Sequence, residues 1–192
     1  MNYQDYIWDL GGTLLDNYET STAAFVHTLQ DFGLTASHDE VYKALKVSTE
    51  YAVRQFAPRN KEFLKAYKAN EAKELEHPIL FDGASELLAQ IIQQGGRNFL
   101  ISHRDDQVLE ILQKTQISVY FTEVVTATNG FKRKPDPESM LYLKDKYQIE
   151  SGLVIGDRPI DIEAGQAAGF SCYLFDNMRN LEEFVDIELE KE

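Results

Sequence analysis

The sequence predicts an α/β fold, in which a doubly wound parallel sheet is interrupted by an all-helical insertion. Short apolar runs of strand length alternate with helical patterns through the second half of the chain. This alternation is typical of a parallel sheet covered by helices on both faces. One more apolar run lies near the N-terminus, and the stretch from Tyr18 to Glu76 has helical periodicity without a convincing strand. A chain of 192 residues is long enough for one core with a small insertion.

The first strand is predicted at the apolar run from Tyr6 to Trp8, which is followed by a single carboxylate, Asp9. Gly11 and Gly12 come next and allow the backbone to turn sharply beside a bound group. We expect Asp9 to lie at the carboxyl end of its strand, where open α/β sheets bind their ligands.

The insertion is predicted to contain several helices. Phe25 and Leu29 fall on one helical face, and Gly33 ends that helix. Phe63 and Tyr67 form a second apolar stripe further along the chain. Both stripes predict helices that pack on one another inside the insertion.

Strands alternate with helices after the insertion. The predicted strands are 98–102, 123–126, 153–156 and 171–175. We therefore assign residues 1–16 and 79–192 to a Rossmann-like core, and residues 17–78 to the helical insertion. The acidic tail 186–192 is predicted to be a solvated helix end.

Composition narrows the class of partner and the compartment. A formal net charge of −13 disfavours nucleic acid and anionic membrane surfaces as partners. The single cysteine, Cys172, cannot form an internal disulfide, which favours a reducing cytoplasm. No early run resembles a signal peptide, and no run approaches the roughly 20 apolar residues of a membrane span. We expect a soluble cytoplasmic protein, and its oligomeric state stays open.

Two later segments carry groups that suit a phosphate. Ser102 ends a predicted strand and His103 follows it at the start of a helix, so a hydroxyl and free backbone N–H groups face the same edge as Asp9. Lys134 lies just before two prolines that restrain its loop. Taken alone, the serine also reads as a helix cap and the lysine as a surface charge.

A pair of carboxylates closes the set. Asp157 follows a buried strand that ends in Gly156, and Asp161 lies four residues further, on the same side of a helix start. Two crowded carboxylates repel unless a cation lies between them, and hard oxygen ligands favour Mg²⁺ over Zn²⁺. Helix capping is the alternative structural role for both residues.

The order of these features resembles the four motifs of the haloacid dehalogenase superfamily. A strand-end Asp, a strand-end Ser, a Lys before Pro and the pattern Gly-Asp-x-x-x-Asp occur in that order. The resemblance covers nearly the whole α/β core. The insertion looks like the helical cap of members related to phosphoglycolate phosphatase. The resemblance implies a Mg²⁺-dependent hydrolase that forms an aspartyl-phosphate.

The resemblance also implies a role for each residue. Asp9 is the nucleophile, and Lys134 steadies the charge of the phosphoryl group. The phosphoryl group is bound by Gly12, Thr13, Ser102, His103 and Lys134. The Mg²⁺ ion is held by Asp9, Asp157, Asp161 and the main-chain carbonyl of Gly11.

One position departs from the family pattern, which is Asp, any residue, Asp, Gly, Thr. Gly11 replaces the second Asp, the group that protonates the leaving alcohol and later helps to activate water. Positioned acid and base groups are typically worth about 10²–10⁴ in rate. The loss is therefore costly for a poor leaving group and tolerable for a good one.

Four interpretations of Gly11 compete. In the first, the protein is a phosphatase of a small phosphorylated metabolite, and a substrate hydroxyl, a water, His27 or His38 replaces the acid. In the second, it resembles a phosphonatase, whose Schiff-base lysine would be Lys43 or Lys46. We favour the first.

The other two interpretations leave phosphatase chemistry. Dehalogenases proper also lack the second Asp and need no metal, but Asp157 and Asp161 would repel a haloacid anion. The last interpretation is a catalytically weak phosphate-binding or regulatory protein, and Gly11 itself is its support. This is the runner-up to the phosphatase.

Overall fold

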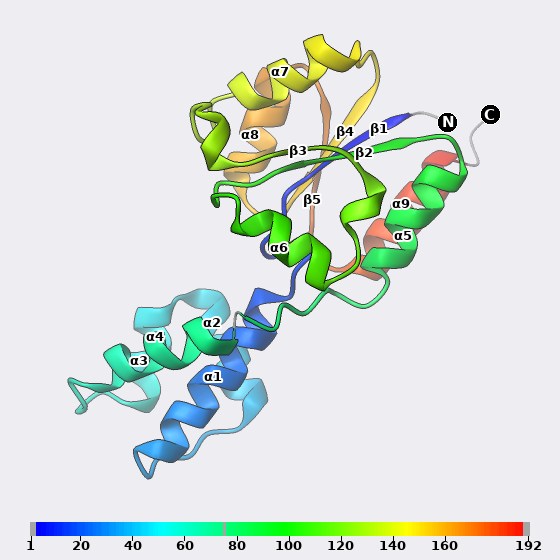
Figure 1. Ribbon diagram of the computed structural model, residues 1–192. Helices are drawn as coiled ribbons and strands as arrows, with labels where there is room; N and C mark the ends of the chain where they lie inside the picture. The colour runs from blue at the N-terminus through cyan, green and yellow to red at the C-terminus, as the bar shows by residue number, and fades with distance from the viewer. Residues whose placement is uncertain (1–2, 75, 190–192) are drawn as a thin grey trace. The chain divides into compact units, whose positions relative to one another are not determined.

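The computed structural model describes residues 3–74 and 76–189 and is drawn in Figure 1. The chain divides into two compact units. The α/β unit comprises Met1–Leu15 and Leu80–Glu192, and the helical unit comprises Asp16–Ile79.

Among the described residues, the α/β unit holds a five-stranded parallel sheet with the strand order β3-β2-β1-β4-β5. The strands are β1 (Asp5–Trp8), β2 (Arg97–Ile101), β3 (Phe121–Val125), β4 (Gly152–Gly156) and β5 (Ser171–Leu174). β1 lies in the middle, between β2 and β4. This topology confirms the predicted Rossmann-like α/β fold. β2 ends one residue earlier than predicted, so Ser102 is the first residue after it.

Helices cover both faces of the sheet (Figure 1). On one face, Tyr6 and Trp8 of β1 pack in a core with α5 (Ala84–Gln93), α6 (Gln107–Lys114) and α9 (Met178–Leu189). On the other face, Ile7 packs with α7 (Glu138–Tyr147) and α8 (Pro159–Ala167). Successive side chains of a strand point to opposite faces, so β1 is buried on both, which explains its continuous apolar run. Two short 3₁₀ helices, η1 (Ser118–Tyr120) and η2 (Ala127–Asn129), flank β3.

A buried amide on β2 joins several elements of the α/β unit. Asn98 is fully buried, and its Oδ1 accepts a hydrogen bond from Trp8 Nε1 at 2.9 Å. Its Nδ2 donates to the carbonyl oxygens of Leu88 at 3.1 Å and Tyr120 at 3.3 Å. Buried polar groups are stable only when they are hydrogen-bonded. This one side chain therefore satisfies the Trp8 indole and ties β1, β2, α5 and η1 together.

The helical unit contains α1 (Asn17–Asp31), α2 (His38–Val47), α3 (Thr49–Phe56) and α4 (Phe63–Glu74). Phe25 lies at the centre of its core, with ring centroids 4.9 Å from Phe63 and 5.0 Å from Tyr67 in edge-to-face geometry. Such aromatic pairs add about 0.5–1.5 kcal/mol each to the burial of their surface. The two predicted apolar stripes thus pack on one another.

Short hydrogen bonds close each unit where the chain passes from one to the other. In the α/β unit, Phe81 N–H donates to the Leu14 carbonyl oxygen at 3.0 Å. In the helical unit, Asp16 N–H donates to the Ile79 carbonyl oxygen at 2.9 Å. The Asp16 side chain also caps α1 by accepting from Glu19 N–H at 3.0 Å.

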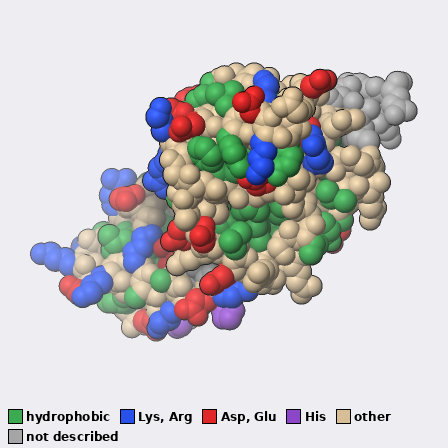
Figure 2. Space-filling model, turned by 45° about the horizontal axis from the view of Figure 1, so that its top comes forward, with side chains coloured by type: hydrophobic (Ala, Val, Ile, Leu, Met, Phe, Trp, Pro, Cys, Tyr) green, Lys and Arg blue, Asp and Glu red, His purple; other side chains and the backbone are tan. Residues whose placement is uncertain are grey.

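Charged side chains of both signs are mixed on the surface. Figure 2 shows Lys and Arg side chains interspersed with Asp and Glu on the face that it displays. Within residues 3–74 and 76–189, no helix combines the length and the apolarity needed to cross a membrane. Of the tail predicted as a helix end, α9 reaches Leu189, and residues 190–192 lie outside the described residues.

Replacing Asn98 by Ala is expected to lower the free energy of unfolding by about 2–3 kcal/mol, because the buried Trp8 N–H loses the Asn98 oxygen that accepts its hydrogen bond. Urea denaturation followed by far-ultraviolet circular dichroism measures the change. Gln113→Ala on the exposed side of α6 is the control and should stay within about 0.5 kcal/mol of wild type. An equal effect of the two substitutions would contradict the structural role of Asn98.

Candidate active site

Polar side chains gather at the carboxyl edge of the sheet. Asp9 follows β1, and its N–H donates to the Ile155 carbonyl oxygen of β4 at 2.9 Å. Ser102 follows β2, and its N–H donates to the Val125 carbonyl oxygen of β3 at 2.9 Å. Asp157 follows β4. The strand hydrogen bonds therefore place these three residues side by side along the edge, as the sequence predicted.

The turn after β1 is tightly hydrogen-bonded. The Leu10 carbonyl oxygen accepts from Leu14 N–H at 3.0 Å and from Leu15 N–H at 2.9 Å, and Gly12 N–H donates to the Leu15 carbonyl oxygen at 2.9 Å. Gly11 and Leu15 form an isolated β-bridge whose hydrogen bonds are made by Leu10 and Gly12, the residues on either side of Gly11. The Gly11 carbonyl oxygen takes no part in these bonds. The predicted metal-ligating carbonyl of Gly11 is thus not consumed by this turn.

The two glycines of the turn differ in what they require. Gly12 has a φ of +86°, and a Cβ there would collide with Asp157 Oδ2. Only glycine satisfies both conditions at this position. Gly11, by contrast, does not have a positive φ, so its φ is one that residues with a side chain also adopt.

Lys134 is the buried cation of the site. Its Nζ donates to Asp9 Oδ1 at 2.6 Å and forms a second ion pair with Asp161 Oδ1. The Ile101 carbonyl oxygen accepts a longer bond from the same Nζ, at 3.4 Å. The Lys134 and Asp161 side chains are each only 1% exposed. An ammonium removed from water in this way is stable only with carboxylate partners.

Asp161 combines two roles. Its Oδ2 accepts a hydrogen bond from Arg158 N–H at 3.2 Å at the start of α8, which is the helix capping that the sequence left as an alternative. Its Oδ1 pairs with Lys134. A Cβ on Gly156 would collide with the Asp161 side chain, so the glycine that ends β4 makes room for this carboxylate.

Asp157 lacks a partner for one oxygen. Its Oδ1 is buried and has no hydrogen-bond partner among the described residues. Burial, followed by the charges of Asp9 and Asp161, raises the pKa of Asp157 to about 6. Burial also raises the pKa of Asp9, and Lys134 acts in the opposite direction. The site therefore holds more negative charge than Lys134 compensates.

The donor set fits a magnesium ion. Asp9, Asp157 and Asp161 each offer a carboxylate oxygen, and these atoms lie within 4.8 Å of one another. They are the one group of three or more such residues found in the described part of the chain. Hard oxygen donors without nitrogen or sulfur favour Mg²⁺. A cation bound here would also give the unpartnered Oδ1 atom of Asp157 a ligand.

Two residues with hydroxyl groups follow the strands of the site, Thr13 after β1 and Ser102 after β2. Thr13 is fully buried, and its Oγ1 has no hydrogen-bond partner among residues 3–74 and 76–189. Ser102 is 6% exposed, and its Oγ accepts from Arg104 N–H at 3.2 Å. This bond closes a local turn and does not cap a helix, because α6 begins at Gln107 with Asp106 as its N-cap, so the capping role considered for Ser102 is not observed. The Thr13 hydroxyl keeps an unused hydrogen-bonding capacity.

His103 makes a contact that the sequence did not predict. Its ring Nε2 accepts a hydrogen bond from the backbone N–H of Lys134 at 2.7 Å. The resemblance had implied that His103 binds the phosphoryl group, and this ring nitrogen instead faces the protein backbone. No residue pattern signals such a bond, because it depends on how two loops meet.

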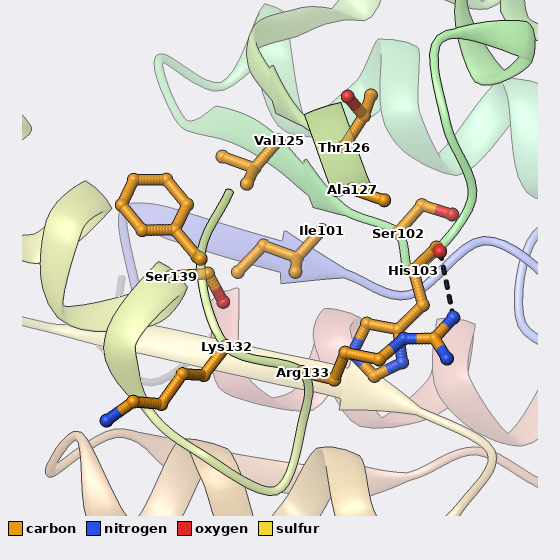
Figure 3. A pocket seen from close by; sticks show the side chains of 10 residues that line it. Ile101, Ser102, His103, Val125, Thr126, Ala127, Lys132, Arg133 and Ser139 are labelled. Carbon is orange, nitrogen blue, oxygen red and sulfur yellow. Dashed lines mark hydrogen bonds between the residues drawn. The ribbon is translucent and has the colours of Figure 1, made fainter. Parts of the chain in front are cut away.

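A cavity of about 320 Å³ opens beside Ser102 and His103, between the ends of β2 and β3 and the start of α7 (Figure 3). Ile101 and Val125 line it from the sheet, and Arg133 lines it from the loop before α7. The cavity could not be predicted from the sequence, because its walls come from segments that lie far apart along the chain.

The helical unit contains the alternative groups considered for Gly11. His38 Nε2 lies 2.8 Å from Glu19 Oε1, and this hydrogen bond raises the pKa of His38. His27 lies 3.8 Å from Asp31, and both side chains are more than half exposed. Lys46 Nζ lies over the Tyr42 ring, 5.0 Å from its centroid. Lys43 is exposed.

Comparisons with known proteins agree with the fold and identify the family. The family model described as haloacid dehalogenase-like hydrolase matches residues 6–175. A phosphoglycolate phosphatase of Aliivibrio fischeri is 29% identical over 189 residues, covering 88% of this chain and 81% of that protein. A pyrophosphatase PpaX of Oceanobacillus iheyensis is 26% identical over 179 residues, with 88% and 81% covered. A solved hydrolase from Streptococcus pneumoniae TIGR4 is 69% identical with a TM-score of 0.93, covering 97% of this chain and 100% of that chain.

The raised pKa of Asp157 predicts a pH-dependent cost in metal-free buffer. Its pKa is about 6 in the fold, against about 3.9 in an unfolded chain, so its ionised form destabilises the fold and the cost grows as pH rises between these values. The free energy of unfolding of Asp157→Asn, relative to that of wild type, should therefore be about 1 kcal/mol higher at pH 7 than at pH 5. Chemical denaturation with a chelator at the two pH values measures the difference. Asp145→Asn, on the exposed side of α7, should show no such difference.

Proposed function

Because the chain belongs to the haloacid dehalogenase-like hydrolase family, we propose that it is a Mg²⁺-dependent phosphatase that acts on a small phosphorylated metabolite. The observation that carries this proposal is the buried Asp9 carboxylate, which Lys134 contacts on Oδ1 and which lies beside Asp157 and Asp161. Phosphoryl transfer through an aspartate requires a carboxylate nucleophile, a fixed positive charge beside it and a binding site for a metal ion. All three are proposed at this edge of the sheet.

In the proposed reaction, an Asp9 oxygen attacks phosphorus, and the bond from phosphorus to the leaving oxygen breaks. Lys134 orients Asp9 and places positive charge beside the transferred group. Water then attacks phosphorus, which releases inorganic phosphate and restores the Asp9 carboxylate. Mg²⁺, bound by Asp9, Asp157, Asp161 and the Gly11 carbonyl, would neutralise charge on the phosphoryl oxygens.

The phosphoryl oxygens need donors. We assign this role to the Thr13 hydroxyl, which is buried and unpartnered among the described residues, and to Ser102. Gly12 allows a close approach of the backbone. His103 lies four residues before α6 rather than at the helix start that the sequence predicted, and we assign its backbone N–H, not its ring, to the phosphate. Lys134 completes the set.

The leaving group is the point at which this chain departs from the family pattern. Gly11 offers no side chain to protonate it, so the preferred substrates are those whose leaving groups need no proton. A phosphate leaving group, as in the pyrophosphate that the name of the PpaX relatives indicates, meets this condition better than an alkoxide. Phosphoglycolate, indicated by other relatives, would require a substitute acid.

Further assignments follow from the family. We propose that the helical unit, predicted over residues 17–78, acts as the cap of the enzyme, the role that the resemblance implies for such an insertion. The single free cysteine, Cys172, fits a reducing cytoplasm. The second candidate function is a weakly active phosphate-binding protein, which Gly11 favours.

Turnover of p-nitrophenyl phosphate and acetyl phosphate is the direct test, because neither leaving group needs protonation. We expect hydrolysis that depends on added Mg²⁺, is lost with a chelator, and falls at least about 10³-fold in Asp9→Asn, since the nucleophile is removed. Release of inorganic phosphate measures it, and circular dichroism checks the fold of the variant. Hydrolysis that survives Asp9→Asn, or no metal-dependent hydrolysis of either compound, would sink the phosphatase proposal.

Gly11→Asp tests the missing acid. The backbone of Gly11 admits a side chain, so the variant is expected to fold. Its kcat on alkyl phosphates should rise about 10²-fold, while p-nitrophenyl phosphate changes little, because only the alkoxide needs a proton. Gly12→Asp is the matched control and should lose activity, since its side chain collides with Asp157. An unchanged alkyl phosphatase rate would mean that another group already supplies the proton.

A further inference from the structure

Two hydrogen bonds join the loop after β2 to the loop that carries Lys134. The backbone N–H of Lys134 donates to His103 Nε2 at 2.7 Å. Arg133 Nη2 donates to the His103 carbonyl oxygen at 3.1 Å (Figure 3). His103 is thus held through both its ring and its backbone, and it contacts the residue whose ammonium meets Asp9.

The ring bond requires one protonation state. Nε2 accepts the Lys134 N–H only when the proton of a neutral imidazole is on Nδ1. Burial, and then the positive charges of Lys134, Arg133 and Arg158, lower the pKa of His103 to about 4. At neutral pH the ring is therefore neutral, and Nε2 keeps its lone pair for the backbone of Lys134.

Packing alone does not fix this loop. Phe131 packs on the Tyr142 ring of α7, with ring centroids 4.8 Å apart, but the next two residues, Lys132 and Arg133, are exposed and line the cavity of about 320 Å³ (Figure 3). Hydrogen bonds must supply the restraint that packing does not provide there. The Lys134 side chain, by contrast, is 1% exposed and has to reach two carboxylates at once.

We propose that His103 is a positioning residue that fixes the backbone of Lys134, so that the Lys134 ammonium meets Asp9 and Asp161 together. This inference rests on the proposed function, because it concerns a reaction at Asp9. The His103 ring does not contact the reacting atoms in this role. It acts through Lys134, and a shift of about 1 Å in such a group can cost about 10²-fold in rate.

His103→Phe and His103→Gln separate the acceptor from the ring volume. Phe keeps a ring without an acceptor, whereas the Gln amide oxygen reaches about as far as Nε2 and accepts a hydrogen bond. With p-nitrophenyl phosphate and Mg²⁺, we expect kcat of the Phe variant to fall about 10–100-fold with KM within about threefold of wild type, and the Gln variant to recover most of the loss. His77→Phe, on an exposed residue, is the control.

Combination with Lys134→Ala shows whether His103 acts through Lys134. The costs of His103→Phe and Lys134→Ala should be strongly non-additive, because the second change removes the group that the first misplaces. Additive costs would overturn the proposal, as would a Gln variant no better than the Phe variant. A rise in KM at unchanged kcat would also overturn it, since it would indicate substrate contact instead.

A second readout needs no activity. Hydrogen exchange followed by NMR should find the Lys134 amide protected in wild type and in His103→Gln, and exchanging at least about tenfold faster in His103→Phe, because its acceptor is lost. Absence of turnover in wild type with this pattern intact would defeat the phosphatase proposal alone. Equal exchange in all three proteins would defeat the positioning role, whatever the activity.

Discussion

The ion pairs of one buried ammonium organise the carboxyl edge of the sheet. Lys134 lies between Asp9, which follows β1, and Asp161, which lies on α8, so ion pairs join the end of the strand to the helix at the centre of the site. Such a cation is stable only while its carboxylates stay close. Asp157 then brings a third carboxylate against one ammonium, and this excess of negative charge contributes to its raised pKa. The same excess is what makes the cluster suitable for a divalent cation.

Much of the site could be predicted because parallel strands end at a common edge. Asp9, Ser102 and Asp157 each follow an apolar run, and detecting the runs is enough to bring them together. The contacts of Lys134 could not be predicted in the same way. It lies 125 positions from Asp9 along the chain, and its partner depends on the path of an irregular loop. The bond of His103 to that loop is likewise invisible, because neither residue type nor spacing encodes it.

Two adjacent glycines illustrate the difference between a structural and a chemical constraint. Gly12 has positive φ and faces Asp157 at a distance that no Cβ tolerates, so geometry alone explains it. Gly11 does not have a positive φ, so its φ does not require glycine. The φ of Gly11 thus does not explain why a carboxylate is absent there. In the proposed reaction, the leaving group would then be one that needs no proton.

The hydrogen bond between Phe81 and Leu14 has a consequence for how such a chain can change over time. It brings together the two points of the α/β unit between which the helical unit is inserted. Because those points already lie within bonding distance, a helical segment of different length or sequence can replace the present one without altering the strand order. The sequence of the helical unit can therefore diverge between related proteins while the α/β unit and its candidate active site stay the same.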